Sequence, residues 1–210
     1  RCTSRARTAT LSDREPAGPP RDRPAAARRE AGAAVAAAGA DINQATQDGG
    51  TPLFIACQYG RLECAQLLRD AGADIDQAMH DGATPLSIAC QNGHLEVARL
   101  LVEAGAAVAH ADTEGFTPLY VACYMGHFEI ARLLRDTGAD INQAEESGGT
   151  PLFVACQEGQ LECVRLLLEA GAVIDQADEE GTTTLFAACQ DGHLEVAKLL
   201  SSYGASRAAT

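Results

Sequence analysis

Cysteines recur at a constant spacing along the chain, and cysteine is the residue type here best suited to disulfide, metal or nucleophilic chemistry. Five of them follow Ala at successive steps of 33 residues: Cys57, Cys90, Cys123, Cys156 and Cys189. Packed helices stand about 8 to 10 Å apart, whereas a disulfide needs Cα atoms within about 7 Å, so equivalent cysteines in neighbouring units cannot readily pair. We expect these five, together with Cys64 and Cys163, to be reduced thiols buried in the protein. Reduced thiols in turn indicate a cytoplasmic or nuclear compartment.

Three histidines share the same period. His94, His127 and His193 each follow a Gly, at the position that Arg61 and Gln160 take in the other two units. This pattern indicates the start of a helix rather than a metal site. The sequence contains no Cys-x-x-Cys, no His-Glu-x-x-His and no Gly-rich phosphate loop ending in Lys and Ser or Thr. We therefore expect that the protein is not an enzyme and that it has no catalytic residue, cofactor, metal or small-molecule substrate.

The elements that hold these residues repeat with them, at a period typical of stacked helical units. A Thr-Pro-Leu-Phe tetrad or a close variant begins at Thr51, Thr84, Thr117, Thr150 and Thr183. Its Thr is suited to cap a helix that Pro starts and that Gly60 ends after about two turns. An apolar stripe predicts a second helix from Leu62 to Gly72, and Asp81-Gly82 predicts a hairpin turn before the next tetrad.

This unit resembles the ankyrin repeat, whose signature is D-x-x-G-x-T-P-L-H-x-A-x-x-x-G followed by L-L and G-A-D. The second copy carries Thr84-Pro85-Leu86-Ser87, Gly93-His94-Leu95-Glu96, Leu100-Leu101 and Gly105-Ala106. The resemblance covers about residues 39 to 205 and implies an all-α helix-turn-helix solenoid with short β-hairpin loops. The family's tetrad His is replaced here by Phe54, Ser87, Tyr120, Phe153 and Phe186. We expect aromatic packing to replace its hydrogen bond to Thr in four of the five repeats.

The repeat register also predicts the domain boundaries. We place a half repeat at 28–46 and full repeats at about 47–79, 80–112, 113–145, 146–178 and 179–206, which together form one domain of residues 28–206. Residues 1–27 are rich in Arg, Ala and Pro without an apolar period, so we expect them to be disordered. The chain begins with Arg1, which suggests a fragment, and the acids Asp13 and Glu15 argue against a transit peptide.

The charge of the chain is strongly uneven. The formal net charge is -13, and residues 41–210 alone carry eight basic and 25 acidic residues, a balance of -17. Such a surface repels nucleic acid and anionic lipid, and a basic protein segment is its electrostatic complement. No apolar run is long enough to cross a membrane. The acidic balance either steers a partner or serves solubility alone, and the sequence leaves both interpretations open.

A binding site is expected where the repeats differ, because the shared residues are needed for stacking. In ankyrin-like domains the hairpin tips and the end of the first helix line a concave groove. The resemblance therefore implies these partner-binding residues: Tyr59, Phe116, Tyr124, Met125, Glu146, Glu158, Glu179, Glu180 and Asp191. Aromatic and Met anchors contribute about 2 kcal/mol or more each. Alternatively, Phe116 packs on the next hairpin, Met125 fills a gap between helices, and the acids are solvated loop tips.

The sequence thus predicts a monomeric, non-catalytic module that binds a partner protein. Its apolar contacts would lie near the third repeat and the partner's basic residues toward the fourth and fifth. The alternative is that this array is the substrate-recruiting or regulatory region of a larger enzyme or channel. Because ankyrin-like scaffolds serve unrelated targets, the fold by itself names no partner.

Overall fold

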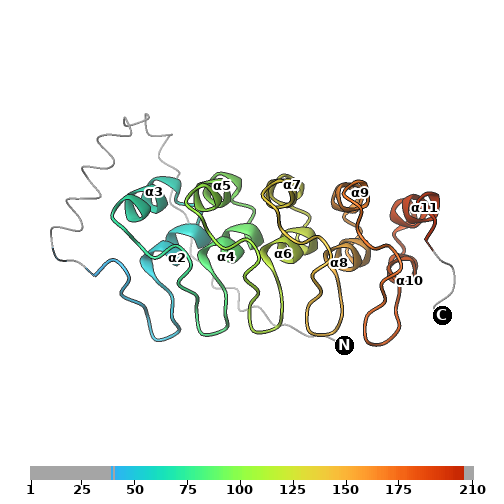
Figure 1. The fold of residues 1–210 in the computed structure, drawn as a ribbon, viewed down its shortest axis with the longest axis horizontal. Coiled ribbons are helices and arrows are strands. Elements are labelled where there is room, and N and C mark those ends of the chain that lie inside the picture. The colour runs from blue at the N-terminus through green and yellow to red at the C-terminus, as the bar shows by residue number, and fades with distance from the viewer. Residues whose placement is uncertain (1–38, 40, 206–210) are drawn as a thin grey trace, which may run out of the picture.

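The computed structural model describes residues 39 and 41–205, which form helix pairs stacked in a single row (Figure 1). The first helices of the pairs are α2 (Pro52–Gln58), α4 (Pro85–Gln91), α6 (Pro118–Tyr124), α8 (Pro151–Gln157) and α10 (Thr184–Gln190). The second helices are α3 (Leu62–Asp70), α5 (Leu95–Glu103), α7 (Phe128–Asp136), α9 (Leu161–Glu169) and α11 (Leu194–Ser202). The predicted all-α helix-turn-helix solenoid is confirmed. The predicted segment 1–27 and the helical part of the half repeat lie outside the described residues.

Each first helix begins where the tetrad predicts. The Oγ1 of Thr51 accepts a hydrogen bond from the backbone N–H of Phe54 at 3.1 Å, and the other four tetrads repeat this cap. The fifth repeat has Thr184 in place of Pro, yet α10 still begins there. The Thr184 hydroxyl donates to the carbonyl oxygen of Ile174 at 2.6 Å. The cap and this added bond keep the register without the proline.

The residue after each interhelical Gly ties neighbouring repeats together. The Nε2 of His94 lies 3.1 Å from the carbonyl oxygen of Gln58 in the preceding repeat. Gly60 has a φ of 64°, and a Cβ there would lie 2.5 Å from the Nδ1 of His94. Equivalent contacts join His127 to Gln91, Gln160 to Tyr124 and His193 to Gln157. These side chains therefore cover the end of the previous first helix, where carbonyl groups lack helical partners.

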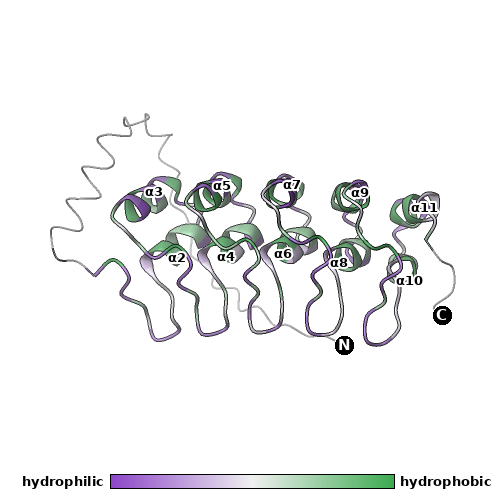
Figure 2. Ribbon diagram, in the orientation of Figure 1, coloured by the Kyte–Doolittle hydropathy of each residue, from purple (hydrophilic) through white to green (hydrophobic). Residues whose placement is uncertain are grey.

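The core runs continuously along the array. Leu53, Leu86, Leu119 and Leu152 of successive first helices are fully buried, and the stripes of the second helices pack against them. Figure 2 shows hydrophobic residues concentrated on the helices and hydrophilic residues in the loops. Each repeat thus buries its apolar side only through contact with its neighbours, as in other solenoids.

The predicted burial of the cysteines holds for five of the seven described ones. Cys57, Cys90, Cys123, Cys156 and Cys163 are buried, and every cysteine in the described part of the chain is a free thiol. The prediction is wrong for Cys64 and Cys189, which are exposed. Cys64 lies on α3 in the first described pair and Cys189 on α10 in the last. No helix pair among the described residues covers their outward sides, whereas a neighbouring pair covers the equivalent cysteines inside the array.

The loops between repeats are tight turns, and no strand is found among the described residues. Hydrogen bonds from Met79 N–H to Ala83 O and from Gly82 N–H to Met79 O close the turn that Asp81-Gly82 predicts. Each loop tip also bonds to the next: the backbone N–H of His80 donates to Asp48 O at 3.2 Å. The same step recurs between Asp81 and Thr113, Glu114 and Glu146, and Ser147 and Glu179. The loops therefore form a continuous row beside the first helices.

Candidate functional site

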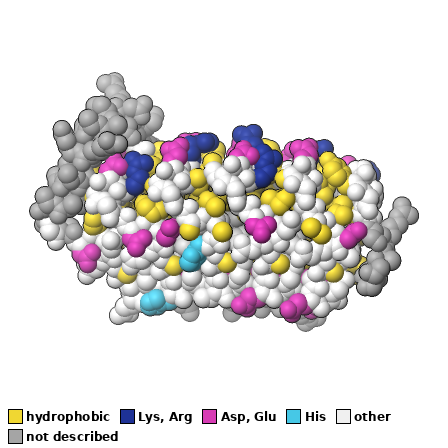
Figure 3. Space-filling model, viewed as in Figure 1, with side chains coloured by type: hydrophobic (Ala, Val, Ile, Leu, Met, Phe, Trp, Pro, Cys, Tyr) yellow, Lys and Arg dark blue, Asp and Glu magenta, His cyan; other side chains and the backbone are white. Residues whose placement is uncertain are grey.

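The inter-repeat loops and the first helices together form one side of the array, called here the loop face. Its charged side chains are acidic, whereas the second helices carry both acids and cations. Between residues 41 and 205 every Lys and Arg lies in a second helix or at its N-cap: Arg61, Arg69, Arg99, Arg132, Arg135, Arg165 and Lys198. In Figure 3 the Lys and Arg side chains follow the edge of the second helices, where Asp and Glu side chains also lie, while the loop side shows Asp, Glu and His without Lys or Arg. The described cations are therefore confined to the second-helix side, while acids lie on both sides of the array.

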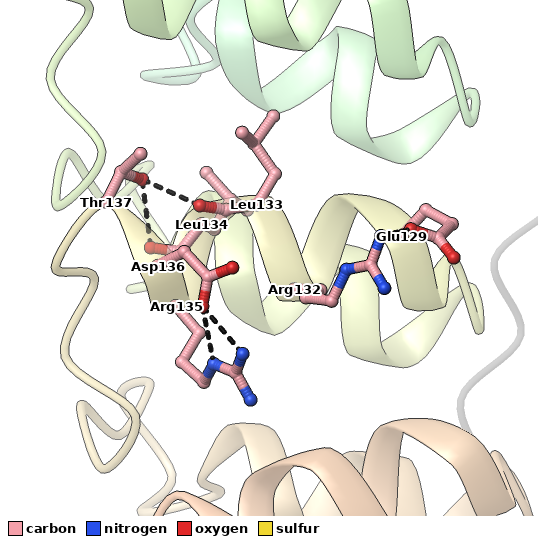
Figure 4. Close-up of polar contacts among 7 residues, drawn as sticks. All are labelled: Glu129, Arg132, Leu133, Leu134, Arg135, Asp136 and Thr137. Carbon is pink, nitrogen blue, oxygen red and sulfur yellow. Dashed lines mark hydrogen bonds and ion pairs between the residues drawn. The ribbon is translucent and has the colours of Figure 1, made fainter.

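Most of these cations are already paired with acids of their own helix. On α7 the Arg135 guanidinium donates two hydrogen bonds to Asp136, and Arg132 pairs with Glu129 (Figure 4). Similar pairs join Arg69 to Asp70, Arg99 to Glu96 and Lys198 to Glu195. The loop acids Asp48, Asp81, Glu114, Glu146 and Glu179 make no such ion pair within the described residues. The loop face therefore carries uncompensated negative charge.

The third repeat places aromatic side chains at the middle of the loop face. The rings of Phe116 and Tyr120 stack with centroids 4.9 Å apart, so half-buried Phe116 packs within its own repeat. Burial raises the pKa of Tyr120, and nearby Glu145 raises it further. Tyr124 and Met125, at the end of α6, are 47% and 40% exposed. Of the predicted apolar contacts in this repeat, these two lie open to a partner while Phe116 supports Tyr120.

The predicted acidic contacts are all exposed on the loop face. Glu146, Glu179 and Glu180 occupy loop tips, whereas Glu158 and Asp191 follow the ends of α8 and α10. Tyr59 has the equivalent place after α2 and is 61% exposed. These residues therefore spread over several repeats and form no compact cluster with Tyr124 and Met125.

Glu145 differs from the neighbouring Glu146 because it serves the loop itself. Its carboxylate accepts hydrogen bonds from the backbone N–H of Ser147 and of Gly149, each at 2.8 Å, and from the Ser147 hydroxyl at 2.5 Å. Partial burial raises the pKa of Glu145, but these hydrogen bonds outweigh it and lower the pKa overall. Glu145 is thus a structural acid, while Glu146 faces solvent.

Sequence reasoning missed an apolar pocket between the first two repeats. Ile55 and Ile88 of α2 and α4 line it together with Met79 of the intervening loop, and its volume is about 340 Å³. Met79 itself was the available signal. The equivalent residues of the other repeats are Thr46, Asp112, Glu145 and Asp178, all polar.

Two larger pockets lie at the ends of the array rather than on the loop face. One of about 840 Å³ includes Phe186, Cys189 and Leu194, and the other, of about 650 Å³, lies on the outward side of the first pair around Ile55 and Cys64. Phe186 is 60% exposed, whereas its equivalent Phe54 is 4% exposed. The expected aromatic packing is therefore wrong for Phe186, because no described repeat covers it. We interpret both end pockets as uncovered stacking surfaces.

Four of the five buried thiols have a raised pKa, whereas the hydrogen bond with Cys123 lowers the pKa of Cys163. Burial raises the pKa of Cys57 and of Cys156 to about 12, and a hydrogen bond with Cys163 together with burial raises the pKa of Cys123. Thiols with such pKa values stay protonated near neutral pH, and the thiolate is the reactive form. The described residues contain no group of three or more His, Cys, Asp or Glu placed to hold a metal ion. No helix among them has the length and apolar character needed to span a membrane.

The sequence matches the family model of ankyrin repeats in three overlapping stretches, residues 25–112, 71–145 and 138–209. The comparison with curated proteins gives no match. The three stretches include all ten described helices, and those helices pack as the repeated pairs that the family model implies. The chain belongs to the ankyrin repeat family.

Proposed function

We propose that this chain is a non-catalytic recruitment module that binds a basic segment of a partner protein on its loop face. Ankyrin repeats are in general protein–protein interaction modules, which supplies the functional class. The proposal adds the surface, the charge of the partner and a monomeric state in a reducing cytoplasmic or nuclear compartment. Reduced, free thiols throughout the described residues are consistent with that compartment.

The separation of charge carries the proposal. Lys and Arg are confined to the second helices, where most are paired with acids, whereas loop acids such as Glu146 and Glu179 have no cationic partner among the described residues. An acidic balance that served solubility alone would not require this separation. A surface of one sign attracts oppositely charged segments and raises their association rate.

The apolar side chains of the third repeat would add an apolar contact with the partner to the electrostatic attraction of the loop face. Tyr124 and Met125 are exposed at the end of α6, and the exposed Glu158 follows α8, the first helix of the next repeat. Tyr and Met are enriched in interfaces, and a few such residues within a polar rim contribute most of the binding free energy. We therefore place the partner's apolar residue over α6 and its basic residues toward α8 and α10.

The test compares the whole 210-residue chain with a Tyr124→Ala/Met125→Ala variant in capture from a cell lysate. Both side chains are exposed, so circular dichroism should show the same helicity for the two proteins. The captured proteins should carry basic segments and bind the variant at least tenfold more weakly, which corresponds to about 1.4 kcal/mol. Raising the salt concentration should release them, because exposed charges are screened.

The matched control changes the opposite side of the array. A Glu96→Gln/Arg99→Gln variant removes an exposed pair on α5 and should capture the same proteins as the wild type. Partners that bind the loop-face variant normally but are lost from this control would place the binding surface on the second helices. That result would refute the proposed surface while leaving the interaction module intact.

A further inference from the structure

The pocket between the first two repeats combines apolar walls with an acidic rim. It lies between α2, α4 and the loops that precede them, and its volume is about 340 Å³. We call it the anchor pocket and define it by Phe54, Ile55, Met79 and Ile88 in its walls and Asp48 and Asp81 at its rim. Ile55 is 43% exposed, so part of the apolar wall is open to solvent.

The pocket arises from one departure in the repeat. Where other loops carry Thr46, Asp112 or Asp178, the side-chain oxygen accepts a hydrogen bond from the N–H of a residue four positions on, in its own loop. Met79 has no such oxygen, and the Ala83 N–H donates instead to Asp81 Oδ1 at 3.0 Å. The turn remains closed while its inner position becomes apolar. The hydrogen bonds of the turn therefore do not require a methionine at this position.

The size and lining of the pocket restrict what can occupy it. Small-molecule sites span about 300 to 1,000 Å³ and combine apolar walls with several convergent polar groups. At about 340 Å³ the anchor pocket lies at the lower limit, and its lining combines Ile55, Met79 and Ile88 with polar residues such as Gln58 and Gln91, which suits one large apolar side chain next to polar groups. The exposed carboxylates of Asp48 and Asp81 form no ion pair with a cation in the described part of the chain. They attract cationic residues on either side of that anchor.

We infer that the anchor pocket receives a single Leu, Ile, Met or Phe side chain of an extended partner segment, with Lys or Arg close by in its sequence. Asp48 and Asp81 both line the pocket, and an extended chain advances about 3.4 Å per residue, so the basic residues lie within about three positions of the anchor. This inference rests on the proposed function and adds a second, more selective contact to it.

The test uses a phage-displayed library of random 12-residue peptides, selected on the whole chain and in parallel on a Met79→Asp variant. Aspartate stands at the equivalent positions 112 and 178 of the second and fourth repeats, so the variant should keep its fold and its thermal midpoint. Peptides enriched on the wild type should contain one large apolar residue within three positions of a Lys or Arg. Synthetic versions should bind the variant at least tenfold more weakly in fluorescence anisotropy.

The Tyr124→Ala/Met125→Ala variant separates this inference from the proposed function. Peptides that lose affinity only for that variant, and bind Met79→Asp as tightly as the wild type, would overturn the anchor pocket and leave the proposed function standing. Enrichment of acidic peptides, or no enrichment at all, would overturn both. A Met79→Leu variant serves as the conservative control, because it keeps an apolar wall and should retain most of the affinity.

Discussion

The exposure of each thiol is set by where its repeat stands in the array. Cys90 and Cys189 occupy the same position of the first helix, yet Cys90 is buried and Cys189 is exposed. The sequence predicted that both thiols are buried, because an Ala precedes each of them at the same position of the repeat. The difference depends on the repeat that follows, which the local sequence does not contain.

We predict that brief treatment of the folded chain with iodoacetamide labels Cys64 and Cys189 and leaves Cys57, Cys90 and Cys156 unlabelled. Burial raises the pKa of Cys57 and of Cys156 to about 12, so a rise from pH 7 to pH 9 should still leave both as protonated thiols. Mass spectrometry of the digested protein measures this site by site, with a urea-unfolded sample as the control. Equal labelling of Cys90 and Cys189 in the folded protein would contradict it.

For the histidines after the interhelical Gly, the sequence pattern predicted their position in the helix but not their hydrogen bond to the preceding repeat. The period correctly predicted that His94 stands at the start of a second helix. Its bond to Gln58 O, and the same bond made by Gln160 to Tyr124 O, become visible only when two repeats are stacked. Histidine and glutamine share this position because either side chain places a nitrogen donor over the preceding helix end.

The loops also contact one another through a second row of hydrogen bonds, in which Asn and Asp side chains accept from backbone N–H groups of the next loop. Asn43 Oδ1 accepts from the N–H of Asp74 at 2.9 Å, and Asn142 Oδ1 accepts from that of Val173 at 2.9 Å. Asp76 makes the equivalent bond to Ala107 N–H. The second repeat has Ala109 at this position, and a methyl group cannot accept a hydrogen bond.

We predict that Ala109→Asn adds the missing contact to the backbone N–H of Asp140 and raises the free energy of unfolding by about 0.5 to 1.5 kcal/mol. Urea unfolding followed by circular dichroism measures this change. Ala109→Leu is the control, because it enlarges the side chain without an acceptor and should not stabilise the chain. An Asn variant no more stable than the Leu variant would show that the loop spacing here differs from that of the other repeats.

Helices and loops also differ in how much of their structure is local. The helix starts were predictable because the cap, the proline and the first turn lie within a few residues of one another. The sequence did not point to Met79 because the pocket that it lines also needs residues of α2 and α4. Those two helices belong to different repeats. A comparison of Met79 with Thr46 and Asp112 contained the signal, but only the packed pair shows that an apolar pocket results.

The array as a whole buries each repeat through its neighbours, and the outermost described surfaces therefore remain partly uncovered. Leu194 is 62% exposed, whereas Leu161, at the equivalent position one repeat earlier, is half buried and packs against the core. Since stability in such arrays is approximately a sum of repeat and nearest-neighbour contributions, equivalent positions should respond differently to the same substitution.

We predict that Leu161→Lys lowers the free energy of unfolding by about 1 to 2 kcal/mol, because it removes buried apolar area between repeats. Leu194→Lys should change it by no more than about 0.5 kcal/mol, as expected for an exposed position. Urea titrations of the two variants and the wild type provide the comparison. Equal losses would mean that another surface covers the last repeat in solution.

The sequence by itself determined the period, the helix boundaries, the family and the acidic balance, because caps, glycine breaks and apolar stripes act over a few residues and then recur. Only the tertiary structure decided which cysteines are buried, that Phe116 supports Tyr120, and that Met79 opens a pocket. It also separated the cations of the second helices from the acids of the loop face. The burial of the cysteines and the pocket at Met79 depend on contacts between residues about one repeat apart, and a sequence pattern specifies such neighbours only after the repeats are stacked. The stack of Phe116 on Tyr120 lies within one repeat and depends on how the loop packs on α6.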